Sequence, residues 1–118
     1  NLKTNDVKVA KEIAKCVRAS SGGFCCVKGI GLALEERGIT QVSMNLVDYE
    51  KNSLYRVLET IRMEARRWGV EVLETEVYGM IPVNALLESA AYYLQIADFN
   101  PEQVLELRLL EMMGDKAE

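Results

Sequence analysis

The stretch Gln41-Val-Ser-Met-Asn-Leu46 alternates polar and apolar residues over its whole length. Alternation with period two is typical of a half-buried β-strand, so it predicts one face in the core and one face outside it. The predicted core face holds Val42, Met44 and Leu46. The opposite face holds Gln41, Ser43 and Asn45, which are two amides and a hydroxyl without a charge. The residues alone leave open whether this polar face is solvated or lines a site for a polar ligand.

A second strand is predicted just before this stretch, from Phe24 to Leu34. Its alternation places three apolar residues on one side, namely Ile30, Leu32 and Leu34. The other side holds the small residues Gly29, Gly31 and Ala33. Small residues on a strand face indicate that another layer or a ligand approaches the backbone closely. The "EERG" segment that follows predicts an antiparallel hairpin with a short loop near Glu36 to Gly38.

Caps and helical periodicity predict helices on either side of this hairpin. The first runs from about Asp6 to Ser20, behind the cap cluster Thr4-Asn5-Asp6. The second begins at Asn52-Ser53 and ends near Gly69. The third should direct an apolar stripe inward, formed by Leu86, Leu87, Ala90, Ala91 and Leu94. The fourth begins at Asn100-Pro101 and runs to about Met113.

A further strand is predicted from Val70 to Val77. The order of elements is then the ferredoxin-like βαββαβ pattern with its first strand largely missing. We therefore expect an α+β fold, a ferredoxin-like α/β sandwich with an antiparallel sheet and helices on one face. The first strand of that fold is central, between the third and the fourth, so Asn1-Leu2 is interpreted as the end of a strand whose body lies upstream. An upstream segment, a swapped neighbour or a rearranged sheet should fill the rest of that position.

The composition is that of one ordinary globular domain. The chain has 118 residues, 49% of them hydrophobic and 27% charged, with a net charge of −4. This acidic balance argues against a nucleic-acid or anionic-membrane partner. No apolar run approaches the roughly 18 residues that a membrane span needs. We expect a soluble, cytoplasmic protein.

Histidine is absent from the sequence. Ser-His or Cys-His catalysis and most zinc sites therefore cannot be built from this chain alone. The cysteines are an odd number, Cys16, Cys25 and Cys26. Neighbouring residues of a strand point to opposite faces, so Cys25 and Cys26 should not readily share a disulfide or a metal. We expect reduced, structural cysteines and no metal site.

The other charged and small-residue motifs have ordinary structural explanations. Gly29-Ile-Gly31 lies within a strand and no helix follows it, so a phosphate-binding loop is a poor interpretation. Solvated or edge charges are the default for Glu35, Glu36, Glu71, Glu74 and Glu76. Surface helix charges are the default for Arg62, Arg66 and Arg67. Core or core-edge packing is the default for Trp68, Tyr92 and Tyr93.

Several longer motifs resemble a known family. They are "NLKTND" at the start of the chain, the turn Ser20-Ser-Gly-Gly23, "RGITQVSMNL", "LYRV" and the corner Gly79-Met-Ile-Pro82. Together they resemble the C-terminal subdomain of the formiminotransferase domain in the glutamate formiminotransferase (formiminotransferase-cyclodeaminase) family. The resemblance extends from Asn1 through "NPEQVLE" and so covers nearly the whole chain. Residues 1–118 are then expected to be a fragment without the N-terminal catalytic subdomain.

The resemblance implies an enzyme of histidine degradation. Such enzymes move a formimino group from N-formimino-L-glutamate to the co-substrate tetrahydrofolate, and folate lies in a tunnel between two subdomains whose sheets face each other. Gln41, Ser43 and Asn45 would face that tunnel or the opposing sheet, and Gly29 and Gly31 would admit the other layer or the pterin. The general base of the family is a histidine of the N-terminal subdomain, so the chain carries no catalytic residue of its own and should be inactive alone.

A rival interpretation from another class is a non-catalytic ferredoxin-like module for binding or assembly. The absence of histidine fits both interpretations. The rival module would keep the family sequence but lack the chemical half, whereas the enzyme interpretation expects the N-terminal subdomain as a partner, with a homodimer or a strand swap possible. The enzyme interpretation adds folate and formiminoglutamate to these partners.

Overall fold

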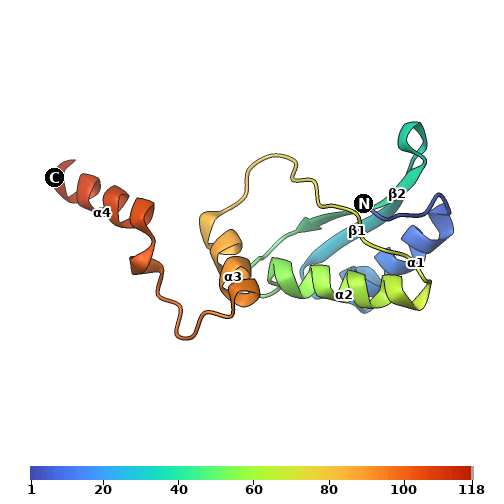
Figure 1. Cartoon of the computed structure of the whole chain (residues 1–118), viewed down its shortest axis with the longest axis horizontal. Coiled ribbons are helices and arrows are strands. Elements are labelled where there is room, and N and C mark those ends of the chain that lie inside the picture. Colours follow the sequence, from blue (N-terminus) through green and yellow to red (C-terminus); the bar gives the residue numbers. More distant parts are fainter. Residues whose placement is uncertain (118) are drawn as a thin grey trace.

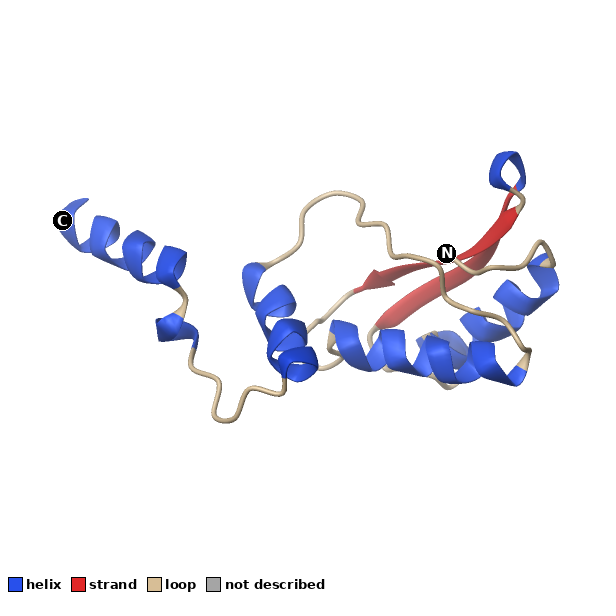
Figure 2. Cartoon of the chain, in the orientation of Figure 1, coloured by secondary structure: helices blue, strands red, loops and turns tan. Residues whose placement is uncertain are grey.

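The structure is a computed structural model that describes residues 1–117 (Figures 1 and 2). Its helices and strands follow the chain as α1 Val7–Val17, β1 Val27–Leu34, β2 Ile39–Leu46, α2 Leu54–Arg67, α3 Val83–Leu94 and α4 Leu105–Ala117. Short 3-10 turns lie at Ala19–Ser21, Glu35–Arg37 and Pro101–Gln103. Among the described residues, no helix is both long and apolar enough to cross a membrane.

The two strands form the predicted antiparallel hairpin. Its register runs from the pair Val27 and Leu46 to the pair Leu34 and Ile39. The connection is the 3-10 turn Glu35–Arg37 followed by Gly38, whose φ of 65° lies in the left-handed region that glycine adopts without strain. The loop is therefore at the position that the "EERG" segment predicts.

Helices α1 and α2 cover one face of the hairpin and form the core with it (Figure 1). Asp6 caps α1 by accepting a hydrogen bond from the Lys8 N–H at 3.0 Å, in agreement with the predicted cap cluster. The buried residues of the core cluster are Leu2, Val9, Ala10, Ile13, Val17, Val27, Val57, Ile61 and Ala65. The fold is thus α+β and ferredoxin-like, with an antiparallel sheet and helices on one face, as predicted.

Asn1 and Leu2 lie where the central strand of this fold is expected. Leu2 forms antiparallel bridges to Thr40 of β2 on one side and to Val72 on the other. The Leu2 N–H donates to the Thr40 carbonyl at 2.8 Å, and the Leu73 N–H donates to the Asn1 carbonyl at 2.8 Å. Leu2 is 1% exposed, so these two residues are part of the packed sheet.

The strand predicted from Val70 to Val77 is reduced to the single bridge at Val72, so that prediction is wrong for most of its length. The segment still has the residue pattern of a strand. A strand, however, is defined by backbone hydrogen bonds to a neighbour, and Asn1 and Leu2 provide that neighbour only as far as Glu74.

The C-terminal third of the chain is packed less closely. Tyr55 of α2 stacks on Tyr92 of α3 with ring centroids 4.3 Å apart, and α4 extends away from the rest of the chain (Figure 1). Ala85 is the buried residue of α3, whereas Leu86 and Leu94 are exposed, so the predicted inward stripe is wrong. Asn100 caps the 3-10 turn Pro101–Gln103, and the helix predicted from that cap begins later, at Leu105.

Candidate functional site

The polar residues of β2 lie on the face of the hairpin that the helices do not cover. Directly opposed residues of an antiparallel pair share a face, and Gln41 opposes Leu32 while Ser43 opposes Ile30. Val42, Met44 and Leu46 pack against the core on the other face. The predicted division of β2 into two faces is therefore confirmed.

The two predicted glycines do not belong to this helix-free face. Gly29 opposes Met44 and Gly31 opposes Val42, which places both on the face under the helices. A Cβ atom on Gly31 would overlap the Lys11 nitrogen and lie 2.6 Å from the Ala10 carbonyl carbon. The small residues thus face α1 of the same domain, so the layer that approaches Gly31 closely is a helix, whereas the resemblance implies the opposing layer or the pterin at Gly29 and Gly31. Alternation separated the two sides of β1 correctly but did not reveal which side faces the helix.

The helix-free face combines polar and apolar groups. Ile30 is 54% exposed and Leu32 is 37% exposed, beside Ser43 and Gln41 respectively. At the far end of the hairpin, exposed Lys28 opposes exposed Asn45. This face can therefore contact a planar apolar surface and offer amide, hydroxyl and ammonium groups at the same time.

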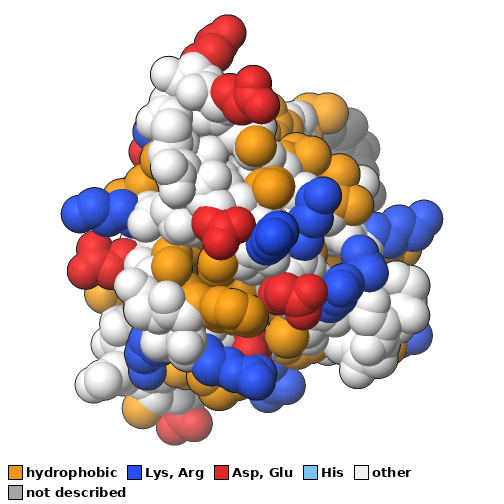
Figure 3. All heavy atoms as spheres, turned by 90° about the vertical axis from the view of Figure 1, so that its right-hand side faces the viewer, with side chains coloured by type: hydrophobic (Ala, Val, Ile, Leu, Met, Phe, Trp, Pro, Cys, Tyr) orange, Lys and Arg blue, Asp and Glu red, His pale blue; other side chains and the backbone are white. Residues whose placement is uncertain are grey.

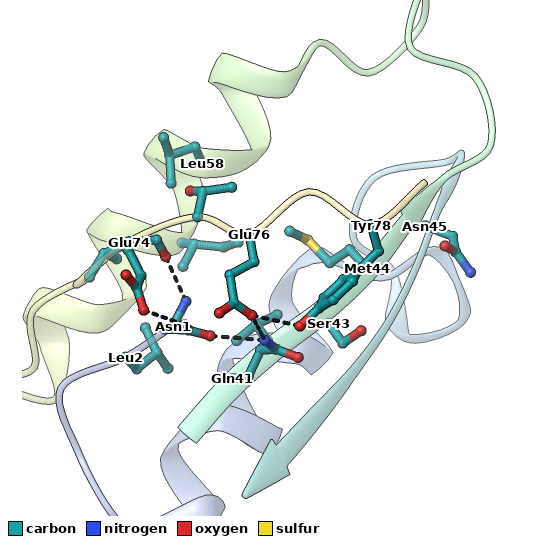
Figure 4. Close-up of a pocket in the computed structure, with 14 residues that line it drawn as sticks. Asn1, Leu2, Gln41, Ser43, Met44, Asn45, Leu58, Glu74, Glu76 and Tyr78 are labelled. Atoms are coloured by element: carbon teal, nitrogen blue, oxygen red, sulfur yellow. Dashed lines mark hydrogen bonds between the residues drawn. The ribbon is translucent and has the colours of Figure 1, made fainter. Parts of the chain in front are cut away.

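A groove lies beside this face, between the edge of β2 and the segment Glu74–Tyr78 (Figure 4). Its volume is about 260 Å³. Leu58 and Ile61 of α2 contribute to its lining from the core side. The remaining lining residues are Asn1, Leu2, Gln41, Val42, Ser43, Met44, Asn45, Val72, Glu74, Thr75, Glu76 and Tyr78.

Gln41 is the centre of a hydrogen-bonded cluster at the mouth of the groove (Figure 4). Its side-chain nitrogen donates to Asn1 Oδ1 at 2.9 Å and to Glu76 Oε2 at 3.2 Å. The Tyr78 hydroxyl donates to the same Glu76 oxygen at 2.7 Å. Glu74 accepts from Asn1 Nδ2 at 2.9 Å.

Arg37 supplies the positive charge of this cluster from the hairpin turn. Its guanidinium lies 2.6 Å from a Glu74 oxygen and 3.5 Å from a Glu76 oxygen. These side chains are partly exposed, so the ion pairs stabilise the fold by little. Their effect is to hold two carboxylates in place beside Gln41.

The cluster fixes the protonation of two of its members. Hydrogen bonds from Asn1 and Arg37 lower the pKa of Glu74, so this carboxylate is ionised at neutral pH. The hydrogen bond to the Glu76 carboxylate raises the pKa of Tyr78, so its hydroxyl remains a donor. The cluster can thus orient a polar ligand through fixed donors and acceptors.

Sequence reasoning missed several of these residues. It assigned Glu74 and Glu76 to edge charges and did not select Arg37 or Tyr78. The spacing Glu74, Glu76, Tyr78 is itself a period-two pattern, and that pattern could have indicated that the three act together. Of the predicted polar residues, Gln41 lies in the cluster, while Ser43 and Asn45 extend from it along β2 toward the exposed end.

The surface in the view of Figure 3 mixes basic, acidic and hydrophobic side chains. A nucleic-acid surface usually gathers Lys and Arg on one face, and this view shows no such gathering.

Residues 1–113 match the family described as formiminotransferase domain. A glutamate formimidoyltransferase of Streptococcus pyogenes serotype M1 is 52% identical over 111 residues, which is 93% of this chain and 37% of that protein. A glutamate formimidoyltransferase of Thermoplasma acidophilum is 39% identical over 109 residues, which is 92% of this chain and 36% of that protein. A formimidoyltransferase-cyclodeaminase of Mus musculus is 43% identical over 67 residues, 57% of this chain and 12% of that protein. The chain thus spans just over a third of the first two relatives.

Proposed function

Because the chain belongs to the formiminotransferase domain family, we propose that it is the folate-binding half of a glutamate formiminotransferase. This enzyme transfers a formimino group from N-formimino-L-glutamate to tetrahydrofolate in histidine degradation. The observation that carries the proposal is the helix-free face of the hairpin. Gln41, Ser43 and Asn45 lie on this face, whereas the intervening residues Val42, Met44 and Leu46 pack against the core on the other face.

The chemistry of that face suits a folate. Ile30 and Leu32 offer exposed apolar surface against which a pterin or aminobenzoyl ring can pack. The uncharged groups of Gln41 and Ser43 can hydrogen-bond the polar edge of the ring without the desolvation cost of a buried charge. Lys28, opposite Asn45, supplies a cation for the carboxylates of folate or formiminoglutamate.

The role of the chain in the reaction is to orient the substrates. The N5 nitrogen of tetrahydrofolate attacks the formimino carbon, and glutamate leaves with its nitrogen. The resemblance implies that the base that accepts the N5 proton is a histidine of the N-terminal subdomain, and this chain contains no histidine. The chain's own contribution is to hold the pterin in register with the formimino carbon and to exclude water from the tunnel between the subdomains.

The same proposal includes the partners of the enzyme and its location in the cell. The partner of the helix-free face is the N-terminal subdomain, and a homodimer or a strand swap is a further assembly that the sheet allows. We place the protein in the cytoplasm, where its three free cysteines would stay reduced.

A second candidate function is a non-catalytic binding or assembly module. The exposure of Ile30 and Leu32 favours it, because these side chains can also pack against an opposing sheet with no ligand between the layers. This candidate predicts binding to the N-terminal subdomain without any folate affinity.

A chimera separates the two candidates. The stretch of the Streptococcus pyogenes relative that aligns over 111 residues is replaced by the corresponding part of this chain. We expect the chimera to transfer the formimino group to tetrahydrofolate, whereas the 118-residue chain alone should show no turnover. A chimera that folds but neither binds tetrahydrofolate nor turns over would support the assembly module instead.

Within the chimera, Asn45→Leu tests the site. We expect the KM for tetrahydrofolate to rise about tenfold, because the ligand groups that Asn45 meets are left without a partner. Folding should survive, since leucine is tolerated in a strand. The matched control is Asn84→Leu on α3, which is also exposed and lies off this face. Equal kinetics for the two variants would remove Asn45 from the site.

A further inference from the structure

Cys25 and Cys26 lie in the turn that leads into β1, and their sulfur atoms are 3.4 Å apart. We infer that they are a redox-active dithiol, which closes to a disulfide between neighbouring residues when a low-molecular-weight disulfide oxidises it. The prediction that the two side chains point apart assumed a strand, and the turn removes that objection. This inference does not depend on folate binding.

Backbone hydrogen bonds hold the turn on both sides of the pair. The Val27 N–H donates to the Phe24 carbonyl at 3.3 Å, which is the hydrogen bond of a β-turn with Cys25 and Cys26 at its centre. The Val47 N–H donates to the Cys26 carbonyl at 2.8 Å and so continues the hairpin to the end of this turn. The fold therefore holds the two residues in a bend in which both sulfur atoms lie on the same side.

Asn52, which is 6% exposed, contacts both cysteines. Its Oδ1 atom accepts from the Cys26 N–H at 2.9 Å and lies 3.6 Å from Cys25 Sγ, which donates to it. The hydrogen bond shared with Cys25 raises the pKa of Cys26, so Cys26 keeps its proton at neutral pH. Cys25 is exposed whereas Cys26 is half-buried, so Cys25 is the sulfur that an oxidant meets first.

Oxidised glutathione provides both electron transfers that the closure needs. The Cys25 thiolate attacks one sulfur of the glutathione disulfide, the bond between the two glutathione sulfurs breaks, and one glutathione leaves as a thiolate. Cys26 then gives its proton to water and attacks Cys25 Sγ, and the second glutathione leaves. In total the two protein thiols lose two electrons and two protons, and one glutathione disulfide becomes two glutathione thiols.

The closed pair should be easy to reduce again. Neighbouring Cα atoms are about 3.8 Å apart across a trans peptide bond, whereas most disulfides join Cα atoms at least about 4.4 Å apart. A disulfide between neighbouring residues is therefore strained, and strained or exposed disulfides are the labile ones. The pair should stay reduced in a reducing compartment and close only while the ratio of oxidised to reduced glutathione is high.

Mass spectrometry after treatment with oxidised glutathione tests the closure directly. The 118-residue chain is treated, its remaining thiols are blocked with N-ethylmaleimide, and it is cut with trypsin. Cys25 and Cys26 fall together in the peptide of residues 19–28, and Cys16 falls in a different peptide. We expect the first peptide to be unlabelled and lighter by two hydrogen atoms, and the Cys16 peptide to be labelled. Dithiothreitol should restore both labels on the first peptide.

Single substitutions separate closure from ordinary thiol exchange. In Cys25→Ser and Cys26→Ser, glutathione should remain attached to the cysteine that is left, because no neighbouring thiol can displace it. Cys16→Ser is the matched control and should close as the unchanged chain does. A glutathione that stays attached to the unchanged chain, two labels on the peptide of residues 19–28, or a dimer linked by a disulfide would each overturn the inference.

The contribution of the fold is measured by comparing the folded chain with the same chain in urea above its unfolding midpoint. Both are equilibrated with the same mixture of oxidised and reduced glutathione, and the ratio of closed to open pair is determined. We expect this ratio to be about tenfold higher in the folded chain, because the turn already holds the sulfur atoms together. Equal ratios would mean that the turn does not prepare the pair, and the inference would fall.

Discussion

Helices α1 and α3 are of similar length and both are rich in apolar residues, yet they differ in what they bury. Helix α1 buries five residues, Val9, Ala10, Ile13, Ala14 and Val17, against the hairpin. In α3 the buried residue is Ala85, and Leu86 and Leu94 remain exposed. Apolar residues at helical spacing favour a helix, but their side chains are buried only where another part of the fold offers a surface of matching shape. The hairpin offers such a surface to α1, because Gly31 has no side chain at the point where the helix backbone approaches. Helix α3 instead packs against α2 near its N-terminal residue Tyr55.

The largest effect on the free energy of unfolding is expected from a substitution in the closely packed region. Ile13→Asp places a carboxylate at a position that is 0% exposed, so it should lower the free energy of unfolding by more than about 3 kcal/mol or unfold the chain. Leu110→Asp on α4, where the side chain is 63% exposed, should change it by less than about 0.5 kcal/mol. Urea denaturation followed by circular dichroism measures both. Similar losses for the two variants would show that the packed and the exposed regions are not different.

A smaller effect is expected where α1 approaches the sheet. Gly31→Ala introduces a Cβ atom that overlaps the Lys11 nitrogen, so the helix must shift, at a cost of about 1 to 3 kcal/mol. Gly29→Ala is the matched control, because its Cβ would lie 3.5 Å from Met44 Cγ, an ordinary contact. The control should be neutral or slightly stabilising. If urea midpoints fall equally for both, close helix packing at Gly31 is not the cause.

A still smaller effect is expected on the dependence of stability on acidic pH. The pKa of Glu74 is lowered from its ordinary value of 4.5 by hydrogen bonds from Asn1 and Arg37. Its contribution to stability is therefore fully present above pH 4.5 and is lost as the pH falls through the lower pKa of the folded state. Glu74→Gln should flatten this part of the dependence of the urea midpoint on pH. Glu88→Gln, on α3, should leave the curve unchanged, and the same flattening in that variant would contradict the assignment.

The smallest effect is expected at the end of the chain. Helix α4 extends away from the hairpin and packs against the turn Pro101–Gln103 (Figure 1). Ending the chain after Val104 should therefore change the melting temperature by less than about 2 °C. A drop of several degrees in differential scanning calorimetry would mean that α4 stabilises the packed region.

The hairpin, α1 and α2 could be predicted from the sequence because their signals are local. The turn at Gly38, the cap at Asp6 and the alternation from Gln41 to Leu46 each act within a few residues. The strand from Val70 to Val77 could not be predicted correctly, because its existence depends on a neighbouring strand and not on its own residues.

The candidate site was predicted only in part, for a related reason. The side of β2 that carries Gln41 followed from periodicity. The companions of Gln41 come from distant segments, since Asn1 is 40 residues away and Glu76 is 35 residues away. Alternation also says nothing about which side of β1 a helix will cover, so it could not identify α1 as the layer that approaches Gly31. Cys25 and Cys26 were likewise predicted on a strand, but they lie in a turn with their sulfur atoms 3.4 Å apart.

The stacked rings of Tyr55 and Tyr92 lie on α2 and α3, at the boundary between the closely packed and the loosely packed regions. The single tryptophan, Trp68, caps α2 at its other end and donates its backbone N–H to Ala65 of the core. The single indole ring therefore lies in the closely packed region, whereas tyrosines lie in both regions, since Tyr78 hydrogen-bonds Glu76 in the Gln41 cluster. Selective excitation of the indole ring monitors the C-terminal end of α2. A spectroscopist can thus watch the closely packed region melt without attaching a dye.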